Sequence, residues 1–382
     1  MHLDIQRTPM IPANIYRLAG VMNAGQGLIS KGEIDGGDTE YAAMNVLRAD
    51  QVVMRKLTAW EGPIAVVPAD FDGFVVSNEF PTFTLGPELL PDWMRHVCRS
   101  PRLWAEMKNR VSGTVQRRKR LNPDQLLQIE FPIPPREVQA SIVEILDAVD
   151  DQVSALDTEA DALDKLWWAL GREMMAAVAG EETVPLASFS DISGGLTKNK
   201  KDLEQADLVE VPYLRVANVH RHHLNLSEVA TIQTTRAKAE KLRLRPGDVL
   251  MNEGGDKDKL GRGHVWEDQI PNCIHQNHVF RVRVTDQRFD PYFVSAWGNT
   301  FGREWFETFG TQTTGIASIN RATLSRFPVP DVPLSVQQGW AGRLGAVVET
   351  IDSLREQVAS LRTLRTSLVS GLLDRTIDIE CY

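Results

Sequence analysis

The sequence has few cysteines and no long apolar run, and each absence excludes a class of protein. Its three cysteines, Cys98, Cys273 and Cys381, are odd in number and far apart in 382 residues. This excludes a disulfide framework and matches no zinc-knuckle spacing. No apolar stretch reaches the roughly 20 residues that span a bilayer, and the opening MHLDIQRTPM lacks the apolar core of a signal peptide. We therefore expect a cytoplasmic protein without a membrane segment.

Sequence signatures of common enzymes are missing as well. There is no Gly-x-x-x-x-Gly-Lys-Ser/Thr phosphate loop, and NPDQ at 122–125 lacks the second proline and the aromatic residue of amino-methyltransferases. A nuclease-like pattern is formed by Pro91, Asp92, Glu106 and Lys108. It falls in a helix-like, Trp-rich stretch, whereas this chemistry places its carboxylates on adjacent strands around a metal. Two further groups match no zinc spacing: Cys273, His275 and His278, and His220, His222 and His223. We expect no catalytic residue and no metal site.

The net charge of −9 is concentrated in one segment. Residues 131–185 contain 12 acidic and 3 basic side chains, whereas residues 1–130 contain 15 of each and residues 186–331 contain 18 acidic and 19 basic ones. An acidic total disfavours nucleic-acid binding, because affinity for DNA depends largely on neutralising phosphates. The balanced segments on either side remain compatible with it.

A Phe-Pro-x-Pro motif occurs twice in the chain, each time ahead of a long amphipathic stretch. FPIPP at 131–135 is followed by Gln139, and FPVPD at 327–331 is followed by Gln337. Prolines here favour an extended entry to a helix rather than its interior.

After each phrase, apolar residues recur with the 4,3,4,3 spacing of a coiled-coil seam. The second series lies 198 residues after the first, and only Arg365, in the place of Trp167, interrupts it. Each helix is expected to have about 33 residues. The first series is Ile142, Leu146, Val149, Val153, Leu156, Ala160, Leu163, Trp167, Leu170 and Met174. The second is Trp340, Leu344, Val347, Ile351, Leu354, Val358, Leu361, Arg365, Leu368 and Leu372.

Upstream of each helix the sequence is rich in β-forming residues, and short pieces align. YRLAGVMN at 16–23 aligns with YLRVANVH at 213–220, and LRADQVVM at 47–54 with LRPGDVLM at 244–251. We therefore predict a mixed α/β chain with two homologous domains in tandem, each followed by a long helix. The two helices are expected to pack as a coiled coil with pseudo-twofold symmetry. The predicted boundaries are 1–130, 131–180, 181–331 and 332–382, and the first domain looks short at its start.

This order of pieces resembles the specificity subunit of type I restriction-modification enzymes. The resemblance rests on PLASF, YLRVANV, LRPGDVLM, the two Phe-Pro phrases with their glutamines, and LVSGLLDRTI near the end. It implies two target-recognition domains that each read half of a bipartite, gapped site in double-stranded DNA. The helices would fix the distance between these halves.

The resemblance also implies partners and cofactors. Two methyltransferase subunits would pack against the helices and supply S-adenosylmethionine, and restriction subunits that translocate DNA would supply ATP and Mg²⁺ chemistry. No cofactor is expected on this chain. The acidic residues of the first helix would then avoid phosphate and attract basic partners: Asp147, Asp150, Asp151, Asp157, Glu159, Asp161 and Asp164.

Cations, amides and hydroxyls on predicted loops of the two domains are the residues that we expect to contact DNA. In the first domain they are Lys56, Gln116, Arg117, Arg118, Lys119 and Arg120. In the second they are Lys198, Lys200, Lys201, His220, Arg221, His222, His223, Lys257, Lys259, Arg262, Thr313 and Thr314. An alternative reading of the same architecture is a scaffold or DNA-mimicking inhibitor that no longer binds DNA.

Overall fold

The computed structural model describes the chain except residues 113–118, 200–205, 314–315 and 374–382, and it describes only the backbone of residues 312, 313 and 316. The chain divides into two compact units. Unit 1 consists of Met1–Leu156 with Glu356–Tyr382, and unit 2 consists of Asp157–Arg355. Within the described residues, no helix is both long and apolar enough to cross a membrane.

Unit 1 contains two sheets. The four-stranded sheet is antiparallel with the order β1-β9-β6-β7, formed by His2–Leu3, Thr82–Thr84, Val52–Met54 and Ile64–Val66. The five-stranded sheet has the order β2-β5-β8-β3-β4, formed by Gln6–Pro9, Ala43–Val46, Val75–Val76, Ile15–Val21 and Leu28–Asp35. Its β3 and β8 are parallel through the pair Leu18 and Val75.

Unit 2 repeats this plan. Its four-stranded antiparallel sheet has the order β11-β18-β14-β16, formed by Ser190–Ser193, Val279–Val284, Asp248–Asn252 and Gly263–Val265. A second sheet, β13-β12-β17, is formed by Ala230–Thr235, Leu208–Leu214 and Ile274–His275, and its β12 and β17 are parallel. Two smaller sheets are β15-β20-β19, formed by Gly254–Gly255, Ile316–Ser318 and Thr311–Thr313, and β10-β21, formed by Thr183–Pro185 and Pro328–Pro330.

The short helices of the two domains also correspond. In unit 1 they are α1 (Pro91–Cys98), α2 (Pro101–Arg110) and α3 (Pro123–Leu127). In unit 2 they are α5 (Arg236–Leu242), which has no counterpart helix in unit 1, then α6 (Pro291–Asn299), α7 (Phe301–Phe309) and α8 (Arg321–Ser325). Proline is the first residue of α1, α2 and α6. An N–H at this position makes no hydrogen bond within the helix, so its absence in proline costs nothing there. The side chain of Asp290 caps α6 by accepting from the Phe293 amide.

Each domain is followed by one long helix. Helix α4 (Arg136–Ala177) has 42 residues and α9 (Leu334–Leu373) has 40, so both are longer than the seam predicted. The extra residues are helical turns beyond the outermost seam positions. Every predicted seam side chain is buried or half-buried, which is consistent with one apolar stripe along each helix.

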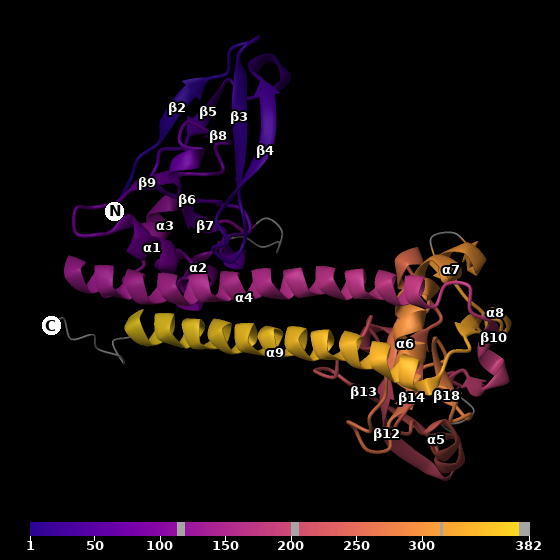
Figure 1. The fold of residues 1–382 in the computed structure, drawn as a ribbon. Helices are drawn as coiled ribbons and strands as arrows, with labels where there is room; N and C mark the ends of the chain where they lie inside the picture. The colour runs from indigo at the N-terminus through magenta and orange to yellow at the C-terminus, as the bar shows by residue number, and fades with distance from the viewer. Residues whose placement is uncertain (113–118, 200–205, 314–315, 374–382) are drawn as a thin grey trace. The chain divides into compact units, whose positions relative to one another are not determined.

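Within each unit, α4 and α9 pack antiparallel (Figure 1). In unit 1, Asp150 pairs with Arg365, and Ile142 lies in the same core cluster as Val369. In unit 2, Asp164 pairs with Arg355 at 3.2 Å, and Trp167 shares a cluster with Leu344. In both units the residue numbers of the contacting α9 positions fall as those of the α4 positions rise, so the two helices run antiparallel.

A fully buried glutamine binds each domain to its long helix in the same way. The Gln139 side chain accepts from the Leu90 amide at 2.8 Å and donates to the carbonyls of Glu88 and Pro134. The Gln337 side chain accepts from the Asp290 amide at 2.9 Å and donates to the carbonyls of Arg288 and Val332. Both side chains are 0% exposed. The duplication is therefore visible at the level of single hydrogen bonds.

These glutamines correct the alignment of the two Phe-Pro phrases. Pro134 and Val332 accept the same bond and are 198 residues apart, which is also the spacing of Gln139 and Gln337. Phe131 therefore corresponds to Val329, and Phe327 to Ile129. The repeated phrase is shifted by two residues between the copies, although the helices after it are in register.

Candidate nucleic-acid interface

Both domains bring three segments together through backbone pairing at an equivalent residue, as isolated bridges in unit 1 and as a three-stranded sheet in unit 2. In unit 1, Arg120 bridges both Leu57 and Ser112. In unit 2, Ser318 pairs with both Gly254 and Thr311 in the sheet β15-β20-β19. Ser318 lies 198 residues after Arg120, the offset of the long helices. Arg120 and Ser318 therefore hold equivalent bridging positions in the two domains.

In unit 1 this element brings together cations that the sequence placed in two separate stretches. The Leu121 amide donates to the Lys56 carbonyl at 3.0 Å, and the Thr58 amide donates to the Lys119 carbonyl at 3.1 Å. Glu79, which the sequence did not single out, lies between them, with its Oε1 3.9 Å from Lys56 Nζ and 3.3 Å from an Arg120 nitrogen. Arg120 remains 55% exposed. Gln116, Arg117 and Arg118 lie outside the described residues.

In unit 2 the element combines two of the predicted clusters. The turn Lys257–Lys259 directly follows β15, and Thr313 ends β19. Lys257 is exposed, Lys259 is paired with Asp256, and Arg262 is half-buried. Thr314 lies outside the described residues. As DNA contacts, Lys257, Lys259 and Arg262 stay a prediction, with Lys257 the most accessible.

The turn at residues 220–223 is half-buried. Arg221 donates to the carbonyls of Asn299 and Asp258 at 2.6 and 2.7 Å and lies over the Trp168 ring. His222 has a positive φ of 53° and packs on Trp167 with ring centroids 4.8 Å apart. Burial lowers the pKa of His222 to about 3, so its imidazole is neutral. Arg221 and His222 are thus held by protein contacts, and as DNA contacts they stay a prediction. His220 and His223 stack on each other.

Of the remaining predicted cluster, Lys198 is exposed, whereas Lys200 and Lys201 lie outside the described residues. The pattern at Pro91, Asp92, Glu106 and Lys108 lies on α1 and α2, as the sequence suggested. Asp92 pairs with Arg95, and Glu106 with Arg110. In the described structure, the carboxylates of Asp92 and Glu106 thus pair with different arginines.

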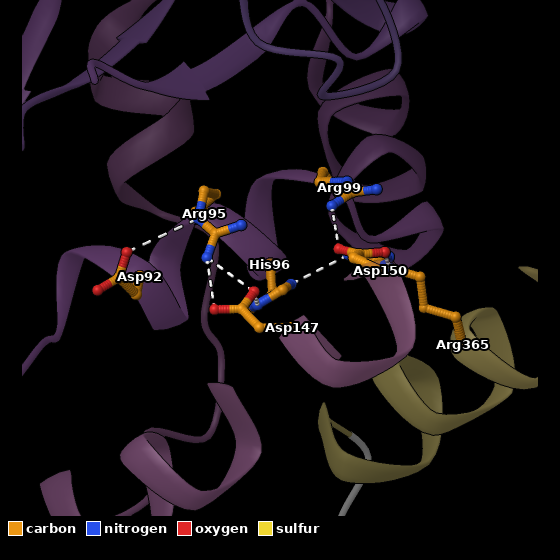
Figure 2. Close-up of polar contacts among 7 residues, drawn as sticks. All are labelled: Asp92, Arg95, His96, Arg99, Asp147, Asp150 and Arg365. Carbon is orange, nitrogen blue, oxygen red and sulfur yellow. Dashed lines mark hydrogen bonds and ion pairs between the residues drawn. The ribbon is translucent and has the colours of Figure 1, made fainter. Parts of the chain in front are cut away.

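One group of described residues has the composition of a metal site: His96, Asp147 and Asp150, with ligand atoms within 4.8 Å of one another. Figure 2 shows why it is an ion network instead. Arg95 donates to Asp147 at 2.8 and 3.0 Å, Arg99 donates to Asp150 at 2.6 Å, and Arg365 donates to both oxygens of Asp150. Three guanidinium groups already neutralise two carboxylates, so a dication would meet a positive surplus.

The protonation of this network follows from its donors. An Arg365 nitrogen lies 3.0 Å from His96 Nδ1, which must accept because guanidinium only donates, and His96 Nε2 then donates to Asp147 at 3.0 Å. Burial, assisted by the charges of Arg95 and Arg365, lowers the pKa of His96 to about 4. Burial alone would raise the pKa of Asp150, but the Arg365 hydrogen bond and the Arg99 and Arg365 charges outweigh it and lower that pKa. The network joins α1, α4 and α9 within unit 1.

The cysteines show no sign of reactivity or metal binding. Cys98 and Cys273 are buried free thiols, and burial raises the pKa of each to about 12. His275 binds the Val279 carbonyl and His278 binds Glu253 instead of converging on Cys273. Cys381 lies outside the described residues.

Comparisons with known proteins agree with this architecture. A family model described as the type I restriction modification DNA specificity domain matches residues 104–163. The specificity subunit of the type I restriction enzyme EcoKI from Escherichia coli (strain K12) is 19% identical over 264 residues, covering 64% of this chain. That match spans only 56% of the length of the curated relative.

Two solved structures share the fold over nearly the whole chain. A chain from a structure described as the basis of complex assembly and conformational transition of the type I R-M system is 17% identical, with a TM-score of 0.55, and covers 97% of this chain and 98% of its own. The S subunit from M. genitalium is 12% identical, with a TM-score of 0.53, and covers 99% and 95%. This chain is similar in sequence and in fold to type I specificity subunits. The predicted tandem α/β fold with two packed long helices is thereby confirmed.

The segment matched by the family model joins the features described above. It begins in α2, contains the cationic loop and Arg120, and ends in α4 beyond Asp150. The sequence offset of 198 also pairs this loop with GTQTTG in the second domain. That signal was available in the sequence but lay outside the pieces that aligned by residue type.

Proposed function

We propose that this chain is the DNA-reading, non-catalytic subunit of a type I restriction-modification complex. Each domain would read one half of a gapped site in double-stranded DNA. The observation that carries the proposal is the equivalent bridging position of Arg120 and Ser318 in the two domains, because the adjoining sequence is cation-rich in one copy and hydroxyl-rich in the other. One scaffold with two different contact surfaces is what an asymmetric, two-part target requires.

The proposed partners are two methyltransferase subunits and the restriction subunits of the same system. S-adenosylmethionine, ATP and Mg²⁺ would be bound by those partners and not by this chain. Exposed acids on α4, such as Asp151, Glu159 and Asp161, would face basic surfaces of the methyltransferase subunits. The DNA-mimic alternative is weaker, because Asp147, Asp150 and Asp164 on the same helix are already paired with arginines.

The test is assembly with the host methyltransferase followed by methylome sequencing. We expect modification of one asymmetric, gapped sequence. Modification at an ungapped sequence, or a complex that assembles but binds no DNA, would refute the proposal; the second result would favour the DNA mimic.

A paired variant tests the first contact surface. Lys119→Ala with Arg120→Ala is expected to reduce the slope of log affinity against log salt by about 0.9 per lost phosphate contact. Lys108→Ala removes an exposed cation from α2 of the same domain and serves as the control, with no expected change. If the salt slope is the same for the wild type, the double variant and the Lys108→Ala control, Lys119 and Arg120 do not contact DNA phosphates.

A further inference from the structure

Unit 2 contains a cavity of about 680 Å³ with strongly basic walls. One wall is the turn after β11, which includes Gly194, Gly195 and Thr197. The others come from α5, β18 and the start of α8, and they contribute five cations: Lys238, Lys241, Arg281, Arg283 and Arg321. No run in the sequence reveals this group, because the five residues are dispersed over more than 80 positions.

Two of these cations have no carboxylate partner among the described residues. Arg283 is fixed by Asp248, with two bonds of 2.6 and 2.7 Å, and Arg281 donates to Asp191 at 2.7 Å. Asp191 is the single acid among the described residues of the cavity wall. Lys241 and Arg321 form no ion pair with a described residue, and these two positive charges favour an anionic ligand.

Two wall residues hold polar atoms without partners. The Arg281 side chain is only 6% exposed, and its Nε has no hydrogen-bond partner among the described residues. The buried Oγ of Ser193, on the same wall, also lacks one. Buried polar groups are nearly always satisfied, so Arg281 Nε and Ser193 Oγ are two exceptions beside the basic cavity.

The backbone of the turn adds further donors. The amides of Gly194 and Gly195 donate no hydrogen bond within the described structure. A side chain at position 195 would clash with the carbonyls of His275 and Gln276, so the turn lies directly against β17 and the residue after it. Arginine, lysine, hydroxyl and glycine amides together are the donor set that proteins use for phosphate oxygens.

We propose that this cavity binds a phosphate group of the DNA backbone, and thus holds the second domain on DNA without reading sequence. The inference rests on the proposed function. The predicted cation Lys198 follows directly after Thr197 in the cavity wall, so the basic surface continues beyond the cavity. A phosphate here sets position and affinity, whereas base contacts made elsewhere set the sequence.

The test uses the assembled complex with its methyltransferase subunits. Lys241→Ala with Arg321→Ala removes two exposed wall cations and leaves Arg281 and Arg283 in place. Arg236→Ala with Arg326→Ala is the matched control: it removes two exposed cations from α5 and the end of α8 that do not line the cavity.

For the test variant, we expect the salt slope of DNA binding to fall by about 1, with the same loss of affinity on target and non-target duplexes. The methylated sequence stays unchanged. If the wild-type complex binds DNA but the salt slope of the test variant is unchanged, the assignment of the cavity as a phosphate site is wrong and the proposed function stands. A wild-type complex that binds no DNA would overturn both.

Two further measurements keep the result decisive. If inorganic phosphate or a free nucleotide raises the melting temperature of the DNA-free wild-type complex but not of the test variant, the cavity serves a free phosphate ligand and the DNA assignment is wrong. If the variant fails to fold, lysine footprinting of the wild-type complex decides. DNA must then protect Lys241 from reductive methylation and leave Lys108 reactive.

Discussion

Arg365 occupies an apolar seam position, and replacing it offers the sharpest test of the ion network in unit 1. Arg365→Met keeps a long side chain on the seam but removes the charge that binds Asp150 and His96. Arg365 is only 8% exposed, so water cannot take its place fully. The variant leaves Asp150 with Arg99 alone and His96 Nδ1 without a donor.

The expected cost follows from what remains. Breaking a fully buried ion pair by removing one partner costs about 3–5 kcal/mol. Asp150 is 23% exposed and keeps Arg99, so we expect about 2–3 kcal/mol of lost unfolding free energy. Arg172→Met, which removes an exposed charge from α4, is expected to change stability by less than about 0.5 kcal/mol.

A double-mutant cycle with Asp150→Asn isolates the pair. Because the two residues share bonds, the double variant is expected to be more stable than the sum of the single effects predicts, by about 1–2 kcal/mol. The assay is urea unfolding combined with hydrogen exchange of the α1 peptide, since a two-unit chain need not unfold in one step. Additive single effects, or unchanged exchange in α1, would refute the coupling.

The same variant has a spectroscopic consequence. Arg365 is one of the charges that hold the His96 pKa near 4, but burial is the larger cause. In Arg365→Met the His96 pKa is therefore expected to rise and to stay below 6.5, measurable by NMR of the imidazole. A rise to 6.5 or above would mean that burial is not the main cause.

Two further predictions concern groups buried in the domains. Gln337→Leu is expected to leave the Asp290 amide and two carbonyls without partners and to lower the unfolding free energy by about 2–4 kcal/mol. Gln139→Leu is expected to lower it by about the same amount in unit 1. Unequal losses in thermal unfolding would contradict the equivalence of the two glutamines. Burial lowers the pKa of the fully buried His275 to about 4, so the unfolded chain binds a proton between pH 6.5 and 4 that the folded chain does not. Stability is therefore expected to fall as pH falls through this range, by up to about 3 kcal/mol from this residue. His275→Asn is expected to flatten that pH dependence in urea unfolding measured at several pH values. An unchanged dependence would refute the lowered pKa of His275.

The long helices could be predicted from sequence because their signal is local and periodic. Apolar spacing alone located the seam from Ile142 to Met174 and its copy 198 residues later. The ends could not be predicted in the same way: α4 begins at Arg136, directly after Pro135, and continues to Ala177. Cap and entry residues do not share the seam period, so the predicted helices were too short.

The partner of Arg365 could not be predicted, because the pair joins residues 215 positions apart. In the sequence, Arg365 is only an exception in an apolar series and Asp150 one acid among many on α4. Long-range charge pairs have no periodic signature, and only the fold shows that Arg95, Arg99 and Arg365 converge on two acids. The same limit explains why the five cations of the cavity in unit 2 were missed.

The two domains share backbone contacts but differ in the sequence of the adjoining loops, and this difference supports the proposed DNA reading. Gln139 and Gln337 form the same bonds, and Arg120 and Ser318 hold the same bridging position. Backbone pairing at these points does not depend on the side chains of the adjoining loops. Those loops can therefore change from QRRKR to QTTG without altering the scaffold. If the loops contributed only to stability, exchange of either loop for the other would change the melting temperature but not the methylated sequence. Because we place DNA contacts there, such an exchange is instead expected to change the recognised half-site while the complex still assembles.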